Sequence, residues 1–134
     1  MNPIYKLDNL IKTLATNLSP VILLLTRVII GYMFLLHGLQ KLTGGVELTS
    51  LMGVGGIIET LGGIFIILGL FTRFTAFILA GQMAVAYFMF HASAETLFNP
   101  VENQGELAVL YSMTYLILMI TGAGKISLDA KFNK

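Results

Sequence analysis

The 134-residue chain contains no cysteine, and charged residues make up only 11% of it. Without thiols the chain cannot form disulfides, bind iron–sulfur clusters through cysteine or attach haem covalently. A net charge of +1 offers no electrostatic basis for binding nucleic acid. Any redox role must therefore use a substrate or cofactor that is not covalently attached.

More than half of the residues are apolar. They make up 56% of the chain, and the mean hydropathy of +0.84 is typical of an integral membrane protein. Four apolar runs, at residues 20–39, 51–71, 74–90 and 107–122, are about long enough to cross a bilayer. Because backbone polar groups in lipid must be bonded within their own segment or in a closed sheet, we expect helices. The sequence predicts an all-α, membrane-spanning four-helix bundle.

A short amphipathic helix is expected before the first run. Such a helix would lie in the membrane interface, with its apolar face toward the lipid. We therefore divide the chain into an amphipathic N-terminal segment (1–18), a four-span membrane domain (19–129) and a polar tail (130–134). The apolar residues that recur at helical spacing in the first segment are Ile4, Leu7, Ile11, Leu14 and Leu18.

Lysine and arginine are unevenly divided between the two sides of the predicted bundle. Both tails and the second connector are cationic, whereas the opposite side carries only Lys41. Because loops rich in lysine and arginine tend to remain in the cytoplasm, we expect both termini to be cytoplasmic. The residues on the cationic side are Lys6, Lys12, Arg73, Lys125, Lys131 and Lys134.

Polar residues within the spans gather toward the outer ends of the predicted helices. Glu59 is the only ionisable residue between Gly53 and Phe71, and burying a charged carboxylate in hydrocarbon costs several kcal/mol unless it has a partner or a function. The other spans place further polar residues at a similar level, which predicts a shared pocket in the outer half. These residues are His37, Lys41, His91, Asn103 and Glu106, while Arg27 and Gln82 lie deeper.

The sequence leaves several alternatives open for these residues. Glu59 either forms a buried ion pair with Arg27 or Lys41, or contacts a ligand or proton directly. The histidines and Lys41 lie near the interface, where they can simply be solvated or anchor headgroups. Glu102 and Glu106 share a proton if they share one helical face, and are otherwise ordinary loop acids.

Two further patterns bear on the ligand. No tight H-x-x-x-H or E-x-x-H spacing is present, so we predict no metal centre. Aromatic residues, Tyr87 among them, and methionines are frequent around the third and fourth runs, where a flat ring such as a quinone would pack. An aromatic belt with methionine as gap filler gives the same composition without a ligand.

Several strings resemble the DoxX family, in order along the chain: RVIIGYMFLLHGLQK (27–41), ETLGGIFIILGLFTR (59–73), GQMAVAYF (81–88), NQGELAVLY (103–111) and GAGKISLD (122–129). The resemblance implies a multi-pass protein of the bacterial inner membrane, with relatives in quinone-reducing thiosulfate oxidation and in catechol or hydroquinone resistance. Where this chain has Gln82, the family pattern often has an acid, and where it has Ala123, a proline. The resemblance carries over to Arg27, His37, Lys41, Glu59, His91, Asn103 and Glu106.

We therefore expect a membrane component of a quinone- or quinol-linked oxidoreductase or detoxification system. Glu59, Glu106 and His37 are the predicted catalytic residues, and quinone or quinol is the predicted substrate, with no covalent cofactor. Expected partners are the bilayer, an oxidoreductase subunit and further copies of the chain. The alternatives are a small transporter of a weak acid or proton and a non-catalytic scaffold subunit. The predicted binding residues are Arg27, Lys41, His91, Asn103, Tyr87 and Gln82.

Overall fold

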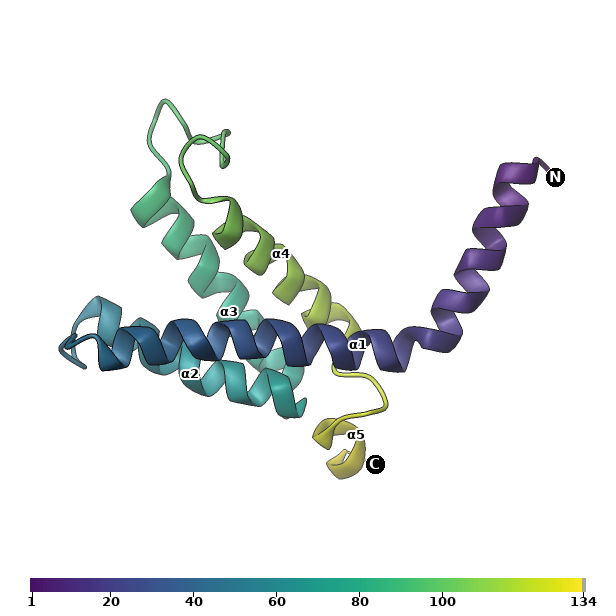
Figure 1. Cartoon of the computed structure of the whole chain (residues 1–134), viewed down its shortest axis with the longest axis horizontal. Helices are drawn as coiled ribbons and strands as arrows, with labels where there is room; N and C mark the ends of the chain where they lie inside the picture. Colours follow the sequence, from purple (N-terminus) through teal and green to yellow (C-terminus); the bar gives the residue numbers. More distant parts are fainter. Residues whose placement is uncertain (134) are drawn as a thin grey trace.

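The computed structural model describes residues 1–133, and these residues form helices and no β-strand. The predicted all-α class is confirmed. Figure 1 shows the helices and the course of the chain. The elements are α1 (Pro3–Thr43), α2 (Leu51–Leu68), α3 (Thr72–Ala86), the π-helix η1 (Tyr87–His91), α4 (Glu106–Thr121) and the short α5 (Leu128–Phe132).

Three helices in residues 1–133 are long and apolar enough to cross a membrane. They are α1, α2 and the continuous segment Thr72–His91, which combines α3 with η1. Helix α4 lies at the predicted fourth span but has 16 residues, just below the usual range of roughly 17–25 for a spanning helix. That α4 crosses the bilayer therefore stays a prediction.

Helix α1 continues through the segment that we expected to form a separate helix. Its 41 residues extend over about 60 Å, roughly twice the hydrocarbon thickness of a bilayer. Pro20 lies inside the helix, where its ring lacks an N–H and crowds the preceding turn. Figure 1 shows α1 bending so that its N-terminal part points away from the other helices. Residues 1–18 are thus not a separate element, and their position at a membrane surface stays a prediction.

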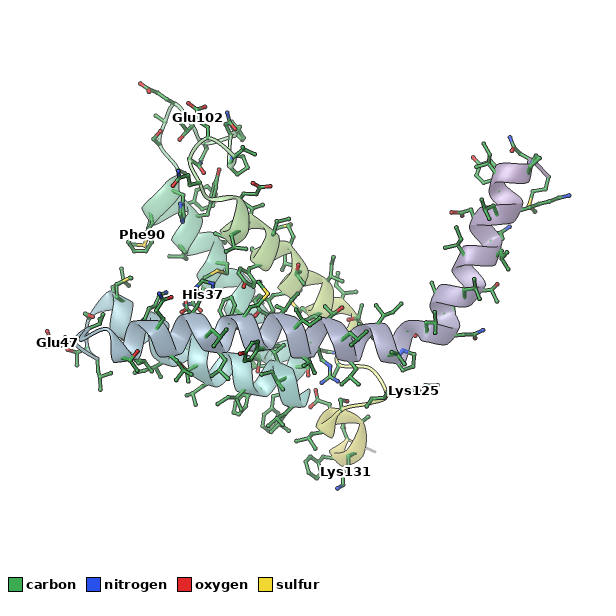
Figure 2. The ribbon with its side chains drawn as sticks, in the orientation of Figure 1. His37, Glu47, Phe90, Glu102, Lys125 and Lys131 are labelled. Atoms are coloured by element: carbon green, nitrogen blue, oxygen red, sulfur yellow. The ribbon has the colours of Figure 1, made fainter. Side chains whose placement is uncertain are left out.

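The helices form two hairpins, α1 with α2 and α3 with α4. Figure 1 shows the hairpins diverging from the α2–α3 turn. We call the end with this turn the turn end, and the end with the α1–α2 and η1–α4 loops the open end. In Figure 2, Glu47 and Glu102 lie at the open end and Lys125 and Lys131 at the turn end.

Glycines bring the backbones of α1 and α2 into contact. A Cβ atom on Gly31 would lie 2.8 Å from the carbonyl oxygen of Gly63, and one on Gly63 would lie 2.7 Å from that of Gly31. These distances are shorter than van der Waals contact, so neither position has room for a side chain. Small residues at such a contact drive helix association in membranes, where lipid provides no hydrophobic effect between helices.

Replacing Gly63 with alanine is expected to lower the free energy of unfolding by about 1–3 kcal/mol, because the added methyl group must push α1 away from α2. Denaturant titration of the detergent-solubilised protein measures this loss. The matched control is Gly81→Ala on α3, where an added Cβ meets nothing within 4 Å. That variant should be neutral or slightly stabilised through helix propensity. An equal loss in both variants would contradict the close contact.

The turn end is held by the returning C-terminal tail. Helix α2 ends at Leu68 and is capped by Gly69, whose φ of 65° suits glycine. The Asp129 carboxylate accepts hydrogen bonds from the backbone N–H groups of Phe71 (2.7 Å) and Thr72 (2.9 Å), at the start of α3. The Arg73 side chain donates to carbonyl groups in the last turn of α4. The turn, the tail and α4 are therefore tied together at one end of the fold.

Candidate functional site

A cavity of about 610 Å³ lies between the two hairpins toward the open end. This volume falls within the range of roughly 300–1,000 Å³ that is typical of small-molecule sites. All of α1, α2, α3, η1 and α4 contribute to its lining, which is mainly apolar. Figure 2 shows His37 on the side of α1 that faces α3. The polar residues of the lining are His37, Lys41, Glu59, Gln82, His91, Gln104 and Tyr111.

Glu59 forms the polar centre of this cavity. It is 2% exposed and lies about 12 Å along α2 from the first residue of that helix. Its Oε1 atom accepts hydrogen bonds from Lys41 Nζ at 2.6 Å and from Gln82 Nε2 at 3.1 Å. Lys41 rather than Arg27 is thus the ion-pair partner, and its charge offsets the cost of burying the carboxylate.

The second carboxylate oxygen of Glu59 is buried without a partner. Among residues 1–133 no group hydrogen-bonds to Glu59 Oε2, and the same holds for Gln82 Oε1 and for the hydroxyl groups of Tyr111 and Tyr115. Buried polar groups are normally satisfied, and one left unpaired costs about 1–3 kcal/mol. We call Glu59 Oε2 the open oxygen. Glu59, Gln82 and Tyr111 line the cavity, whereas Tyr115 does not, so the cavity lining has hydrogen-bonding capacity for a ligand or for ordered water.

Gly55 leaves space next to this centre. It lies one helical turn before Glu59 on α2 and also lines the cavity. A Cβ atom at this position would lie 3.5 Å from Gln82 Nε2 and 3.8 Å from Lys41 Nζ, which is ordinary contact. A longer side chain there would extend into the cavity next to Gln82 and Lys41, the two residues that hold Glu59.

Two histidines line the cavity on opposite hairpins. The His37 ring meets the Tyr111 ring edge to face, with centroids 6.3 Å apart. His91 ends the π-helix η1, and its Nδ1 lies 3.3 Å from the carbonyl oxygen of Asn103. Short π-helical segments within α-helices are frequent at functional sites. In residues 1–133, no group of three or more histidine, aspartate or glutamate side chains is arranged to hold a metal ion.

The structure separates Arg27 from the polar centre. Arg27 is fully buried and donates to the carbonyl groups of Ile67 and Ile126 at the turn end. It does not line the cavity. Gln82, which residue counting placed deeper than Glu59, instead lies beside it. The hairpins diverge, so the position along one helix does not translate directly into depth along another.

Glu106 is also separated from Glu59. It is exposed, as the first residue of α4, and Gln104, Leu107 and Tyr111 take the places in the lining that we expected for it. Glu102 precedes the helix and accepts a hydrogen bond from Asn99 instead, so the two acids do not share a helical face. Glu106 is therefore not among the residues that line the cavity with Glu59, and its catalytic role stays a prediction.

Asn103 and Tyr87 stabilise the η1–α4 loop. The Tyr87 hydroxyl donates to the carbonyl of Leu97 at 2.7 Å, and the Asn103 side-chain amide donates to the Tyr87 hydroxyl and to the carbonyl of Thr96, both at 3.0 Å. Neither side chain lines the cavity. Sequence reasoning did not assign Gln104, Tyr111 or Gly55 to the site.

Comparison with known proteins is consistent with a membrane protein. The DoxX family model matches residues 22–92, more than half of the chain. A Haemophilus influenzae protein described as uncharacterized is 45% identical over 125 residues, covering 86% of this chain and 93% of that protein. The Escherichia coli inner membrane protein YqjF is 32% identical over 131 residues, covering 87% of this chain and 96% of YqjF. No solved structure matches the chain.

Proposed function

Because the chain belongs to the DoxX family of membrane proteins, we propose that it binds a neutral ring compound of the quinone or quinol class between its hairpins. In this proposal it serves as a membrane component of a quinone- or quinol-linked oxidoreductase or detoxification system. The observation that carries the proposal is the open oxygen of Glu59, which has no hydrogen-bond partner within residues 1–133, on a residue that lines a mainly apolar cavity.

The chemistry of the lining supports a neutral ligand with a hydroxyl group. Glu59 and Lys41 balance each other's charge, so the site offers no net charge to an ionic ligand. A ring hydroxyl donating to the open oxygen would form a charge-assisted hydrogen bond, which is stronger than a neutral one. The flat faces of such a ring would pack against Phe34, Met83 and Tyr111, all of which line the cavity.

The same geometry suits proton transfer from a ring hydroxyl. Glu59 would accept the proton, Lys41 would keep the carboxylate charged before the transfer, and Gln82 would hold its orientation. His37 would exchange the proton with water at the open end. Oxidation of a quinol to a quinone releases two protons and two electrons. Glu59 would accept the two protons one after the other and pass each to His37, and both electrons would pass to an oxidoreductase partner.

Replacing Glu59 with glutamine is expected to weaken binding of decylhydroquinone by about 10- to 100-fold. The open oxygen becomes an amide donor, and a charge-assisted hydrogen bond worth about 1.5–3 kcal/mol is lost. Equilibrium binding of tritiated decylhydroquinone to protein in lipid nanodiscs, kept anaerobic, measures the change.

The matched control is Glu106→Gln, the same chemical change at an exposed residue outside the cavity. Its affinity should stay within twofold of the parent protein. Equal affinity in Glu59→Gln and the parent would contradict the proposal. Proton or weak-acid flux into proteoliposomes that Glu59→Gln abolishes, without any binding of the ring compound, would favour the small transporter instead.

A further inference from the structure

The cavity has one wall on each hairpin, and the two walls join at the turn end. Helices α2 and α3 are consecutive and are linked by the short turn that Asp129 holds. Toward the open end each helix packs against its own hairpin partner, and Figure 1 shows the hairpins diverging in that direction. The space between α2 and the α3–η1 segment therefore widens away from the turn.

Side chains along this space both line the cavity and are exposed at the protein surface. Examples are Met52 on α2, which is 45% exposed, and Met89 on η1, which is 57% exposed. A residue with both properties lies at the rim of an opening. Figure 2 labels Phe90, which belongs to this rim, at the end of the α3–η1 helix. The rim residues are Leu51, Met52 and Val54 on α2 and Val85, Met89 and Phe90 on α3 and η1.

The rim is entirely apolar, and it lies on two of the helices that are long and apolar enough to span a membrane. Exposed apolar surface on such helices faces lipid chains, since hydrocarbon surrounds the spanning segments. An opening bordered by such a surface would lead from the cavity into the bilayer. Methionine at two rim positions adds adaptability, because its unbranched side chain changes rotamer easily.

The opposite side of the cavity is closed by aromatic packing. The Phe34 ring on α1 meets the Tyr111 and Tyr115 rings of α4 edge to face, with centroids 4.9 and 5.1 Å apart. At the open end the lining is polar and includes Lys41, His91 and Gln104. Two routes to Glu59 remain to be distinguished: a sideways one through the apolar rim and an aqueous one past these polar residues.

We propose that the ligand reaches Glu59 sideways from the bilayer, between α2 and the α3–η1 segment. The substrate class is then a lipophile dissolved in the membrane, with a hydroxylated ring as its head and an apolar tail. The ring occupies the cavity at the open oxygen, and the tail extends between Met52 and Met89 into the lipid. This inference rests on the proposed function and adds the route and the tail.

The absence of cysteine from the chain allows a reversible test. Met52→Cys and Met89→Cys are each prepared in nanodiscs and labelled with a bulky methanethiosulfonate reagent, which a reductant removes. The rate at which tritiated decylhydroquinone associates is measured before labelling, after labelling and after reduction. Ile117→Cys places the same label on the exposed face of α4, outside the cavity lining, and Gln104→Cys places it among the polar residues of the open end.

Sideways access predicts that labels at positions 52 and 89 slow association at least tenfold and that reduction restores it. The label at position 117 should have no effect, and the label at position 104, which lies in the cavity lining, should slow association less than the labels at positions 52 and 89 do. Slowing by the label at position 104 alone, or equal rates in all variants, would overturn the inference.

Two control measurements separate this inference from the proposed function. A parent protein that binds unsubstituted hydroquinone but not decylhydroquinone would contradict the inference that the ligand carries an apolar tail. The proposed function would still stand. A parent protein that binds neither compound would overturn both.

Discussion

Replacing Gly55 with leucine is expected to abolish binding of decylhydroquinone, with at least a 100-fold loss of affinity, while the protein remains folded. The first added carbon makes only ordinary contacts, 3.5 Å from Gln82 Nε2 and 3.8 Å from Lys41 Nζ. The remaining carbons would take up cavity space next to the Lys41 and Gln82 groups that hold Glu59. Equilibrium binding in nanodiscs, together with the thermal unfolding temperature, measures both parts of this expectation.

The control for this variant is Gly81→Leu. Gly81 lies on α3, and a Cβ atom there meets nothing within 4 Å, so the new side chain extends into open space rather than into the cavity. Its affinity should equal that of the parent protein. Because Gly55→Leu keeps the charge of Glu59 and its lysine partner, loss of binding in this variant alone would locate the ligand in the cavity. Unchanged affinity in Gly55→Leu would show that the ligand binds elsewhere.

Replacing Arg27 with methionine is expected to produce the largest loss of stability, about 2–6 kcal/mol. The side chain is fully buried, and its guanidinium donates to the carbonyl groups of Ile67 on α2 and Ile126 in the tail. Methionine leaves both carbonyls without this donor, at about 1–3 kcal/mol each. Equilibrium unfolding in mixed detergent micelles measures the loss. Lys12→Met removes a charge from an exposed part of α1 and should have almost no effect.

The same variant tests the predicted role of Arg27 in ligand binding. Below its unfolding temperature, Arg27→Met should bind decylhydroquinone within twofold of the parent protein, because Arg27 lies outside the cavity lining. A large loss of affinity with unchanged stability would contradict the structural role of Arg27 and support its predicted role as a ligand-binding residue. Arg27→Lys should rescue little stability, since a single ammonium group does not reproduce the forked geometry of the guanidinium.

The helices and the polar centre follow from local properties of the sequence. Apolar runs of sufficient length predicted α2, α3 with η1, and α4 to within a few residues, because a helix satisfies its own backbone in lipid. A lone acid in such a run indicated a buried partner, and the cationic residues of the first span limited the choice to Arg27 or Lys41. The structure selects Lys41.

Other parts of the site depend on contacts between distant segments and on helix direction. The Asp129 carboxylate caps α3 from 57 residues away, and no local pattern indicates that pairing. Gln82 reaches Glu59 because α2 and α3 approach each other from a shared turn. Glu106 is exposed although α4 begins close to where the sequence predicts, because the face that a residue presents depends on how its helix packs against the others. For Tyr111, the available signal was its place one helical turn after Leu107 among the aromatic residues of the fourth run.

Native mass spectrometry of the protein, released gently from its own membrane, tests most directly whether a ligand occupies the cavity. The parent protein and Gly81→Leu are predicted to carry the same neutral small-molecule adduct, with the mass of a hydroxylated ring compound bearing an apolar tail. Gly55→Leu is predicted to lack it, because leucine fills the space beside Glu59. Spectra in which the parent protein carries no adduct, or in which Gly55→Leu carries as much as the parent, would contradict a ligand at the open oxygen.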